Sequence, residues 1–323
     1  MASLWVGLPI LGFLPGVPIR LGTQWLSLIV CLVVLGVGVL RPRSHAPLFG
    51  WGILACLGLA AVHWAQPMPT VRWAVQATLL LASASLLVGQ AAWMRKALIG
   101  CAWVQVVVVS LQWCHVPLPF PQPVMGSHLA GTVGSIRPAS ILIGLAALWS
   151  TGWSSWVLSG VACLTGSGTV VPVIVLAKWW PYRTRPIGWI VGLVGIVAYA
   201  RLSQRWLFAL SERAEVWTAW PLSWWGLGFR AFPGGFQDDT AFGREMGWRD
   251  AHNVLLDWVG RFGLPGFLVL VALIWWIWRR KQEPWTLVFL GWVACWQSLE
   301  QFPVLVIPLL VWLIGLCEGQ NTV

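Results

Sequence analysis

The stretch that decides how this chain folds runs from Ala251 to Gly266 and reads AHNVLLDWVGRFGLPG. It follows the longest polar segment of the chain and leads into an apolar run that ends at Arg279-Arg280-Lys281. Asp250 is a good N-cap, so the sequence predicts a helix that begins at Ala251. The sequence Gly263-Leu264-Pro265-Gly266 predicts a break before the apolar run continues.

His252 falls in the first turn of this predicted helix, where the helix dipole is positive. A cation is disfavoured there, so we expect the imidazole to stay neutral near pH 7. A neutral histidine can act as a general base in catalysis. The alternative is a histidine that hydrogen-bonds locally and caps the helix.

The composition excludes a water-soluble globule, because 58% of the residues are hydrophobic and 9% are charged, against roughly 25% charged in soluble domains. Apolar runs of helical length recur from end to end, so we predict a polytopic helical membrane protein embedded in a lipid bilayer. The net charge of +10 is spread along the chain, which argues against a nucleic-acid partner. Many of the 28 tryptophans flank apolar runs, and most are expected at the membrane interfaces. The seven cysteines have no paired spacing and indicate neither disulfides nor a metal site.

The predicted fold class is all-α: a transmembrane bundle of about twelve spans. Residues 1–323 form a single membrane domain, and residues 202–250 form a long external loop that contains short helices. The expected spans centre on 4–19, 22–40, 47–65, 73–91, 97–116, 138–150, 152–164, 168–180, 187–201, 264–278, 285–299 and 304–317.

Charge sets the expected orientation. With the N-terminus in the cytoplasm, every charged internal loop carries basic residues, as the positive-inside rule requires. The acidic residues fall mostly outside, except for Glu283 and Glu318. Both termini are therefore expected to be cytoplasmic. The basic residues on the internal side are Arg41, Arg43, Arg95, Lys96, Arg183, Arg185, Arg279, Arg280 and Lys281, with Lys178 close to that side.

Two external loops carry arginine and tryptophan. The loop 117–137 ends in Arg137, and the loop 202–250 mixes arginines with carboxylates and tryptophans. Guanidinium groups form paired hydrogen bonds to phosphate oxygens, so arginines cluster where anions bind. The alternative for Arg213 is an ion pair with a nearby carboxylate. Trp224 and Trp225 could pack on sugar rings or anchor the loop in the lipid head-group layer.

Four features along the chain, in order, resemble those of one known family. They are Gly131-Thr132-Val133-Gly134 before Pro138, Ser211-Glu212-Arg213 to Trp217, Trp225-Gly226-Leu227-Gly228 with Phe232, and His252-Asn253 followed by Gly263-Leu264-Pro265-Gly266. Together they resemble the O-antigen ligase and O-antigen polymerase superfamily over about residues 130 to 278.

The resemblance implies a glycosyltransferase of the bacterial inner membrane, which takes a glycan from an undecaprenyl-diphosphate carrier. The acceptor would be a growing glycan, lipid A-core or a protein. Members are metal-independent, so no cofactor is expected. By this resemblance His252 would deprotonate the acceptor hydroxyl, and Arg213 would hold the diphosphate. The candidates for substrate binding are Arg137, Arg201, Arg230, Asn253, Trp224 and Trp225.

The chain departs from the family pattern at Ser167-Gly168-Thr169, where an arginine is common. Arg137, Arg201 or Arg230 could supply that charge, and the sequence does not choose among them. Ligase and polymerase share these motifs and are not separated. Two other functions remain open: a transporter or flippase of lipid-linked glycans, and a non-catalytic family member with a structural role.

Overall fold

The fold is given by a computed structural model of the whole chain. It describes residues 47–62, 67–116, 131, 136–165, 169–182, 253–280, 283–296 and 303–318, with short pieces at 184, 189–190, 192–193, 197, 214, 217–218 and 223–228. Within these residues the chain is helical and contains no strand, so the all-α prediction is confirmed for the part described.

The long helices follow the expected apolar runs closely. In the described ranges they are α3 (Pro47–Val62), α4 (Pro67–Leu86), α5 (Ala91–Trp113), α6 (Ile136–Trp149), α7 (Gly152–Leu164), α8 (Val171–Trp179), α11 (Val254–Arg280), α12 (Pro284–Trp296) and α13 (Pro303–Glu318), with a short 3₁₀ turn, η2 (Trp180–Tyr182), after α8. The expected spans before residue 47 and at 187–201 lie wholly or mostly outside the described residues.

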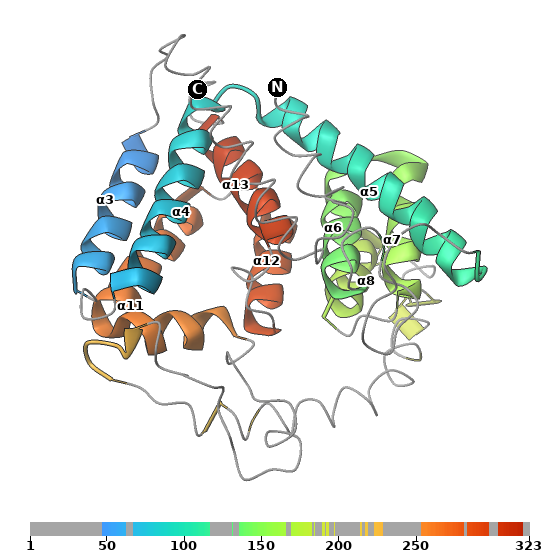
Figure 1. Ribbon diagram of the computed structural model, residues 1–323. Coiled ribbons are helices and arrows are strands. Elements are labelled where there is room, and N and C mark those ends of the chain that lie inside the picture. Colours follow the sequence, from blue (N-terminus) through green and yellow to red (C-terminus); the bar gives the residue numbers. More distant parts are fainter. Residues whose placement is uncertain are drawn as a thin grey trace.

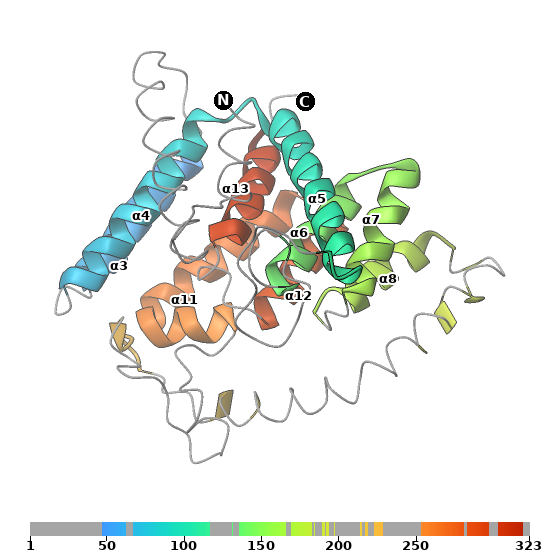
Figure 2. The ribbon, with the colours of Figure 1, turned by 45° about the vertical axis from the view of Figure 1, so that its right-hand side comes forward.

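The helices form two groups with a pair between them. Figures 1 and 2 both show α3 beside α4 on one side, α5 to α8 on the other, and α12 with α13 in between. Part of α11 crosses the lower end of α4 in Figure 1. Helix α11, which follows the polar segment in the sequence, thus lies at the lower end of α3 and α4 in this view.

Helix α6 is the centre of the core. Every residue from Pro138 to Ala147 is buried, and α6 packs against α5, α7, α8, α12 and α13. A helix that is apolar all round can be buried on every side, which explains why this short run lies inside the bundle. Gly144 marks the tightest point, because Val170 and Phe289 approach it from two neighbouring elements.

An ion pair joins the start of α5 to the turn between α11 and α12. Arg95 pairs with Glu283, and its guanidinium carbon lies 5.1 Å from the centre of the Trp149 ring. The indole of Trp149 donates in turn to the hydroxyl of Thr286, 3.1 Å away. Four elements therefore meet at Arg95, and both side chains of the ion pair are partly buried.

Glu318, at the end of α13, fixes the turn between α4 and α5. Its Oε1 accepts hydrogen bonds from the amides of Gly89 at 2.6 Å and of Ala91 at 2.9 Å. Ala91 is the first residue of α5, so the carboxylate takes up an amide that has no partner within the helix. Charge-assisted bonds of this kind are stronger than neutral ones.

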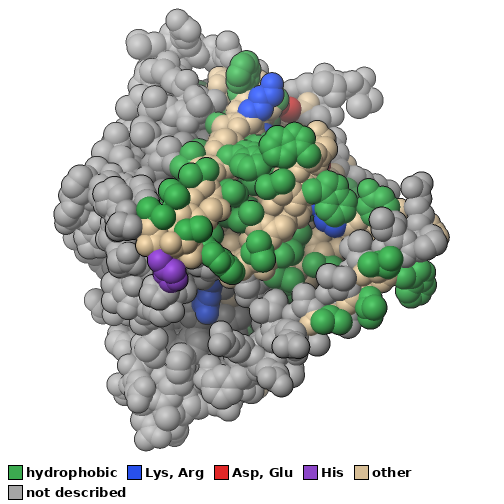
Figure 3. Space-filling view, turned by 90° about the vertical axis from the view of Figure 1, so that its right-hand side faces the viewer, with side chains coloured by type: hydrophobic (Ala, Val, Ile, Leu, Met, Phe, Trp, Pro, Cys, Tyr) green, Lys and Arg blue, Asp and Glu red, His purple; other side chains and the backbone are tan. Residues whose placement is uncertain are grey.

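Large apolar side chains cover much of the described surface. On α11 the exposed residues recur every three or four positions, which places them on one face of the helix. Figure 3 shows hydrophobic side chains spread over the face formed by α5 to α8, with few charged groups among them. Among the described helices, α5 and α11 are long and apolar enough to cross a membrane. The exposed stripe on α11 consists of Leu264, Phe267, Leu268, Val271, Ile274, Trp275 and Trp278.

We predict that Gly144→Val destabilises the chain. A Cβ at Gly144 would lie 2.9 Å from Val170 and 3.0 Å from Phe289, and both neighbours are fully buried. Overpacking of a core costs about 1–3 kcal/mol, so the thermal unfolding midpoint of the purified protein should fall. Gly160→Val is the matched control, because a Cβ on that helical glycine meets nothing within 4 Å. Equal midpoints for the two variants would contradict the packing described around α6.

Candidate functional site

The helix that follows the polar segment begins three residues later than the sequence predicts. α11 starts at Val254, and Asn253 is its N-cap: Asn253 Oδ1 accepts from the amides of Leu255 at 3.0 Å and Leu256 at 3.2 Å. The prediction of a start at Ala251 with Asp250 as the cap is therefore wrong. Asparagine and aspartate cap about equally well, and here the asparagine satisfies two amides that have no partner within the helix.

The predicted break at Gly263-Leu264-Pro265-Gly266 is confirmed. Gly263 has φ of 59° and ψ of −147° inside α11, a conformation that essentially only glycine adopts. Pro265 lies two residues further on. It has no amide hydrogen, so it cannot donate to the carbonyl of Arg261 as a regular helix would require. Helix α11 therefore consists of two helical parts that meet at Gly263.

A segment from the polar loop fills this break. In a regular helix the Leu264 amide would donate to the carbonyl of Gly260. Instead, Leu264 donates to the carbonyl of Trp224 at 2.8 Å, and the carbonyl of Gly260 accepts from the amide of Leu227 at 2.9 Å. The two hydrogen bonds to residues 224–227 replace one bond within the helix, so the break leaves neither group unpaired.

Two glycines permit this backbone contact. Gly226 has φ of 78°, and a Cβ on it would overlap the carbonyl of Arg261. A Cβ on Gly263 would overlap the amide nitrogen of Gly226 in return. Each position therefore requires glycine for two reasons: its dihedral angles, and the small space between the two backbone segments. The structure thus joins two features that the sequence presents 37 positions apart, counted from Gly226 to Gly263.

An aromatic cluster holds the break from the side of α4. Trp73 on α4 lies 4.8 Å from Phe262 and 6.2 Å from Trp258, centre to centre. The Trp258 indole donates to the carbonyl of Gly266 at 2.7 Å, which bridges the two parts of α11. These rings are not among the site residues predicted from the sequence. The spacing of four between Trp258 and Phe262, which places both on one helix face, could have indicated them.

The structure describes only some of the predicted site residues. Trp224 and Trp225 lie beside the break with 77% and 69% of their surfaces exposed, so both could contact a ligand or a lipid head group. Asn253 is buried, and its side-chain oxygen is engaged by the helix amides. Arg137 is exposed in the first turn of α6. His252, Arg213, Arg201 and Arg230 lie outside the described residues.

One further loop residue is placed on the bundle. The ring of Trp217 lies 5.6 Å from that of Trp296 at the end of α12. In the sequence Trp217 follows Arg213 by four positions, and residues 214, 217 and 218 are helical. This contact fixes one described point of the polar loop against α12.

Gly131, the first residue of the glycine-rich stretch before α6, packs against α5. Gly131 has φ of 58°, and its amide donates to Oε1 of Gln112 at 2.9 Å. A Cβ on Gly131 would overlap the side chain of the fully buried Gln105. Glycine is therefore required at this position as well, because a polar side chain of α5 occupies the space.

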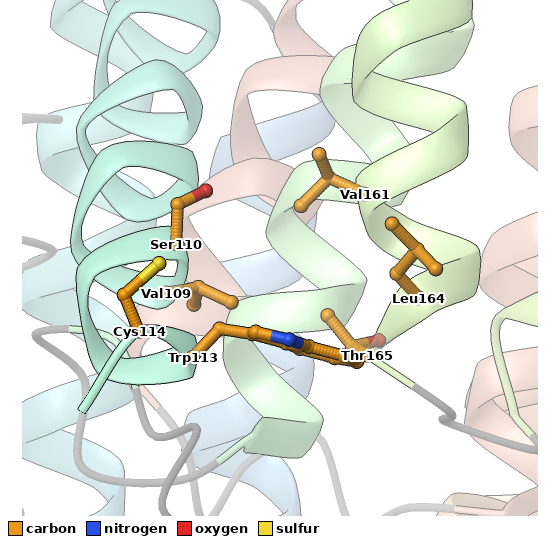
Figure 4. Close-up of a pocket in the computed structure, with 7 residues that line it drawn as sticks. All are labelled: Val109, Ser110, Trp113, Cys114, Val161, Leu164 and Thr165. Carbon is orange, nitrogen blue, oxygen red and sulfur yellow. The ribbon is translucent and has the colours of Figure 1, made fainter.

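A cavity of about 230 Å³ lies between the ends of α5 and α7. Figure 4 shows that α5 and α7 supply its opposite walls and that the Trp113 ring extends towards Thr165. None of the described lining residues is a predicted site residue. The lining consists of Val109, Ser110, Trp113 and Cys114 from α5 and its C-cap, with Val161, Leu164 and Thr165 from α7 and its C-cap.

Comparison with known proteins adds nothing to the resemblance, which rests on the motifs alone. No protein-family model and no curated protein sequence matches the chain.

We predict that Gly263→Ala releases the loop segment from α11. The added Cβ overlaps Gly226 and forces an alanine into a glycine conformation, at a cost of about 1–3 kcal/mol from the dihedral angles alone. Hydrogen exchange at the Leu227 and Leu264 amides should accelerate together. Gly89→Ala is the control, because Gly89 also has positive φ but a Cβ there meets nothing within 4 Å. Unchanged protection in Gly263→Ala would show that the two backbones do not touch.

Asn253→Ala should fray the start of α11. Loss of an N-cap costs about 1 kcal/mol, so the exchange rate of the Leu255 and Leu256 amides should rise about fivefold. Asn253→Asp keeps a capping oxygen and should retain protection. If both variants lose protection equally, the role of Asn253 depends on its amide nitrogen and not on the cap.

Proposed function

We propose that this chain is a bundle of about twelve transmembrane helices, with both termini in the cytoplasm and residues 202–250 outside. The exposed apolar face of α11 supports this, since a stripe of seven large side chains would be costly in water. Helix α5 supports it by length, because 23 residues extend about 34 Å, enough to cross a hydrocarbon core of about 30 Å.

We propose that the protein is a glycosyltransferase of the O-antigen ligase or polymerase type in the bacterial inner membrane. One observation carries the proposal: residues 224–227 bond through their backbone to Gly260 and Leu264, on either side of the break, and this brings Gly226 into contact with Gly263. The two glycines belong to two of the motifs on which the resemblance depends, and motifs that act in one site should lie together. A chance match of short glycine motifs gives no reason for such a contact.

The proposed reaction transfers a glycan from an undecaprenyl-diphosphate carrier to an acceptor hydroxyl. The acceptor oxygen attacks the anomeric carbon of the glycan, and the bond from that carbon to the diphosphate oxygen breaks. His252 accepts the hydroxyl proton as general base. Arg213 stabilises the negative charge on the leaving diphosphate, to which a guanidinium can donate two parallel hydrogen bonds. In this reaction the chain's own residues supply the base and the charge stabilisation.

The remaining candidates would hold the substrate. Arg137, Arg201 or Arg230 would supply the charge that is missing at Ser167-Gly168-Thr169. Trp224 and Trp225 are exposed beside the break, where a sugar ring could stack on either indole. Asn253 is the exception and would act indirectly: its cap fixes the start of α11, and Asn253 follows the proposed base His252 directly in the sequence. The acceptor would be a glycan, lipid A-core or a protein.

Transport of the lipid-linked glycan is the second candidate function. The break in α11 favours it, since transporters build their binding sites at interrupted helices. The two functions differ in their products, because only transfer forms a new glycosidic bond. Flux of the glycan across reconstituted vesicles without a new glycosidic bond would favour transport, and a new bond formed on one side would favour transfer.

We predict that His252→Ala and Arg213→Ala abolish glycan transfer while the protein is still made and inserted. Loss of a general base lowers a rate by about 10²–10⁴, and loss of one charge-stabilising donor lowers it by about 10²–10³. The measurement is the formation of glycan-modified acceptor by purified protein in lipid vesicles, from a lipid-diphosphate donor.

His115→Asn is the matched control for the histidine. His115 lies just beyond α5 with φ of 56°, a conformation that asparagine tolerates, and it belongs to none of the motifs. Its transfer rate should equal that of the unmodified protein. Full transfer by His252→Ala would remove the proposed mechanism.

A further inference from the structure

Five basic side chains of the described helices each lie over a tryptophan ring. The cation lies 4.2 to 5.4 Å from the ring centre in every case, which is within the range of a cation–π interaction. Such pairs occur roughly once per 70–80 residues in proteins, and the 28 tryptophans of this chain favour them. The pairs are Arg95 with Trp149, Lys96 with Trp93, Lys178 with Trp156, Arg279 with Trp275, and Arg280 with Trp276.

The pairs belong to one connected region. Arg95 contacts both Glu283 and Trp149, which ties the start of α5 to the ends of α6 and α11. Lys178 contacts Ser155 at the start of α7, and Ser155 donates to the carbonyl of Ala147 near the end of α6. The region therefore runs from α8 through α7 and α6 to α5 and the turn between α11 and α12.

Two of the five pairs are internal and three face outwards. Arg95 and Arg280 are half-buried over half-buried rings, and Arg95 is already neutralised by Glu283. In contrast, Lys96 and Arg279 are exposed over exposed rings, and Lys178 lies over the exposed ring of Trp156. The first two pairs hold helices together, and the three outer pairs present both a charge and an aromatic face to the surroundings.

Each outer pair lies at one end of an apolar stripe on the helix that carries its tryptophan. On α5 the exposed positions continue from Trp93 and Lys96 to Val104, Val107 and Leu111. On α11 they continue from Arg279 and Trp275 back through Ile274, Val271 and Leu268. On α7 they continue from Trp156 through Val157 to Leu164. A molecule that fits such a surface has an anionic head and a long apolar tail.

We propose that the Lys96–Trp93, Lys178–Trp156 and Arg279–Trp275 pairs bind the headgroups of anionic phospholipids, whose acyl chains lie along the three stripes. The indole rings lie at the depth of the headgroups, as interfacial tryptophans do. Each cation keeps N–H donors for phosphate oxygens while its ring holds it in place. This inference rests on the membrane placement proposed above and is independent of the transfer reaction.

The charge balance favours an anionic lipid over a zwitterionic one. The region contains five basic side chains against two carboxylates, Glu283 and Glu318, among its described residues. Both carboxylates are engaged, one with Arg95 and the other with backbone amides. Lys96 and Arg279 therefore keep their positive charge for the surroundings. The stripes below them exclude a nucleic acid or a free phosphate, because neither has apolar surface to cover them.

The test uses the full-length protein in nanodiscs made from equal amounts of phosphatidylglycerol and phosphatidylcholine with the same acyl chains. After mild extraction, native mass spectrometry counts each lipid that stays bound. We expect phosphatidylglycerol to be retained in excess. In the double variant Lys96→Gln with Arg279→Gln the excess should fall, by about fivefold for each lost charge near an anionic surface.

The double variant Lys96→Arg with Arg279→Lys is the matched control and should retain the excess, because it conserves both charges. Equal retention of the two lipids by the unmodified protein would overturn the proposal, and so would an excess that survives the loss of both charges. Glycan transfer by the glutamine variant, measured in vesicles, should be unchanged, which separates this inference from the proposed reaction. A chain that retains no lipid at all would instead contradict the membrane placement.

Discussion

The break in α11 is maintained by an exchange of backbone hydrogen bonds, and the candidate site depends on it. A helix interrupted at one residue leaves an amide and a carbonyl without partners, and each unpaired group is costly away from water. Here Trp224 and Leu227 supply those partners. The polar loop is therefore attached to the helix by its main chain, at a point that only glycines allow. This attachment also fixes the main chain that carries Trp224 and Trp225.

The sequence predicted where helices lie better than where they begin. The apolar run at 304–317 corresponds to α13 at Pro303–Glu318, and the short run at 138–150 corresponds to α6 at Ile136–Trp149. The cap of α11 was misplaced because Asp250 and Asn253 satisfy the same rule, and only the backbone decides between them. The sequence contains both glycine motifs, but no local pattern in it predicts that Gly226 and Gly263 touch. Long-range pairing of this kind follows from tertiary structure and not from local patterns.

Tryptophan has more roles in this protein than the interfacial one expected from its frequency. Indoles of the described helices donate hydrogen bonds within the bundle, among them Trp149 to Thr286, Trp103 to Ser154 and Trp258 to Gly266. Others hold cations or pack on one another, as Trp180 does on Trp285. An indole combines a large apolar surface with one donor, so it can fill space between helices and still satisfy a polar group. The spacing of three or four residues identifies Trp93 with Lys96 and Trp275 with Arg279, whereas the pairing of Trp156 with Lys178 requires the fold.

The carboxylate of Glu318 has a consequence for how the chain is assembled. It binds amides that precede it by 229 and 227 positions, so the turn that starts α5 is completed only after the ribosome has made almost all of the described chain. Until then the first amide of α5 must find another hydrogen-bond acceptor. The contact between α13 and the start of α5 therefore forms after the other described helices have been synthesised.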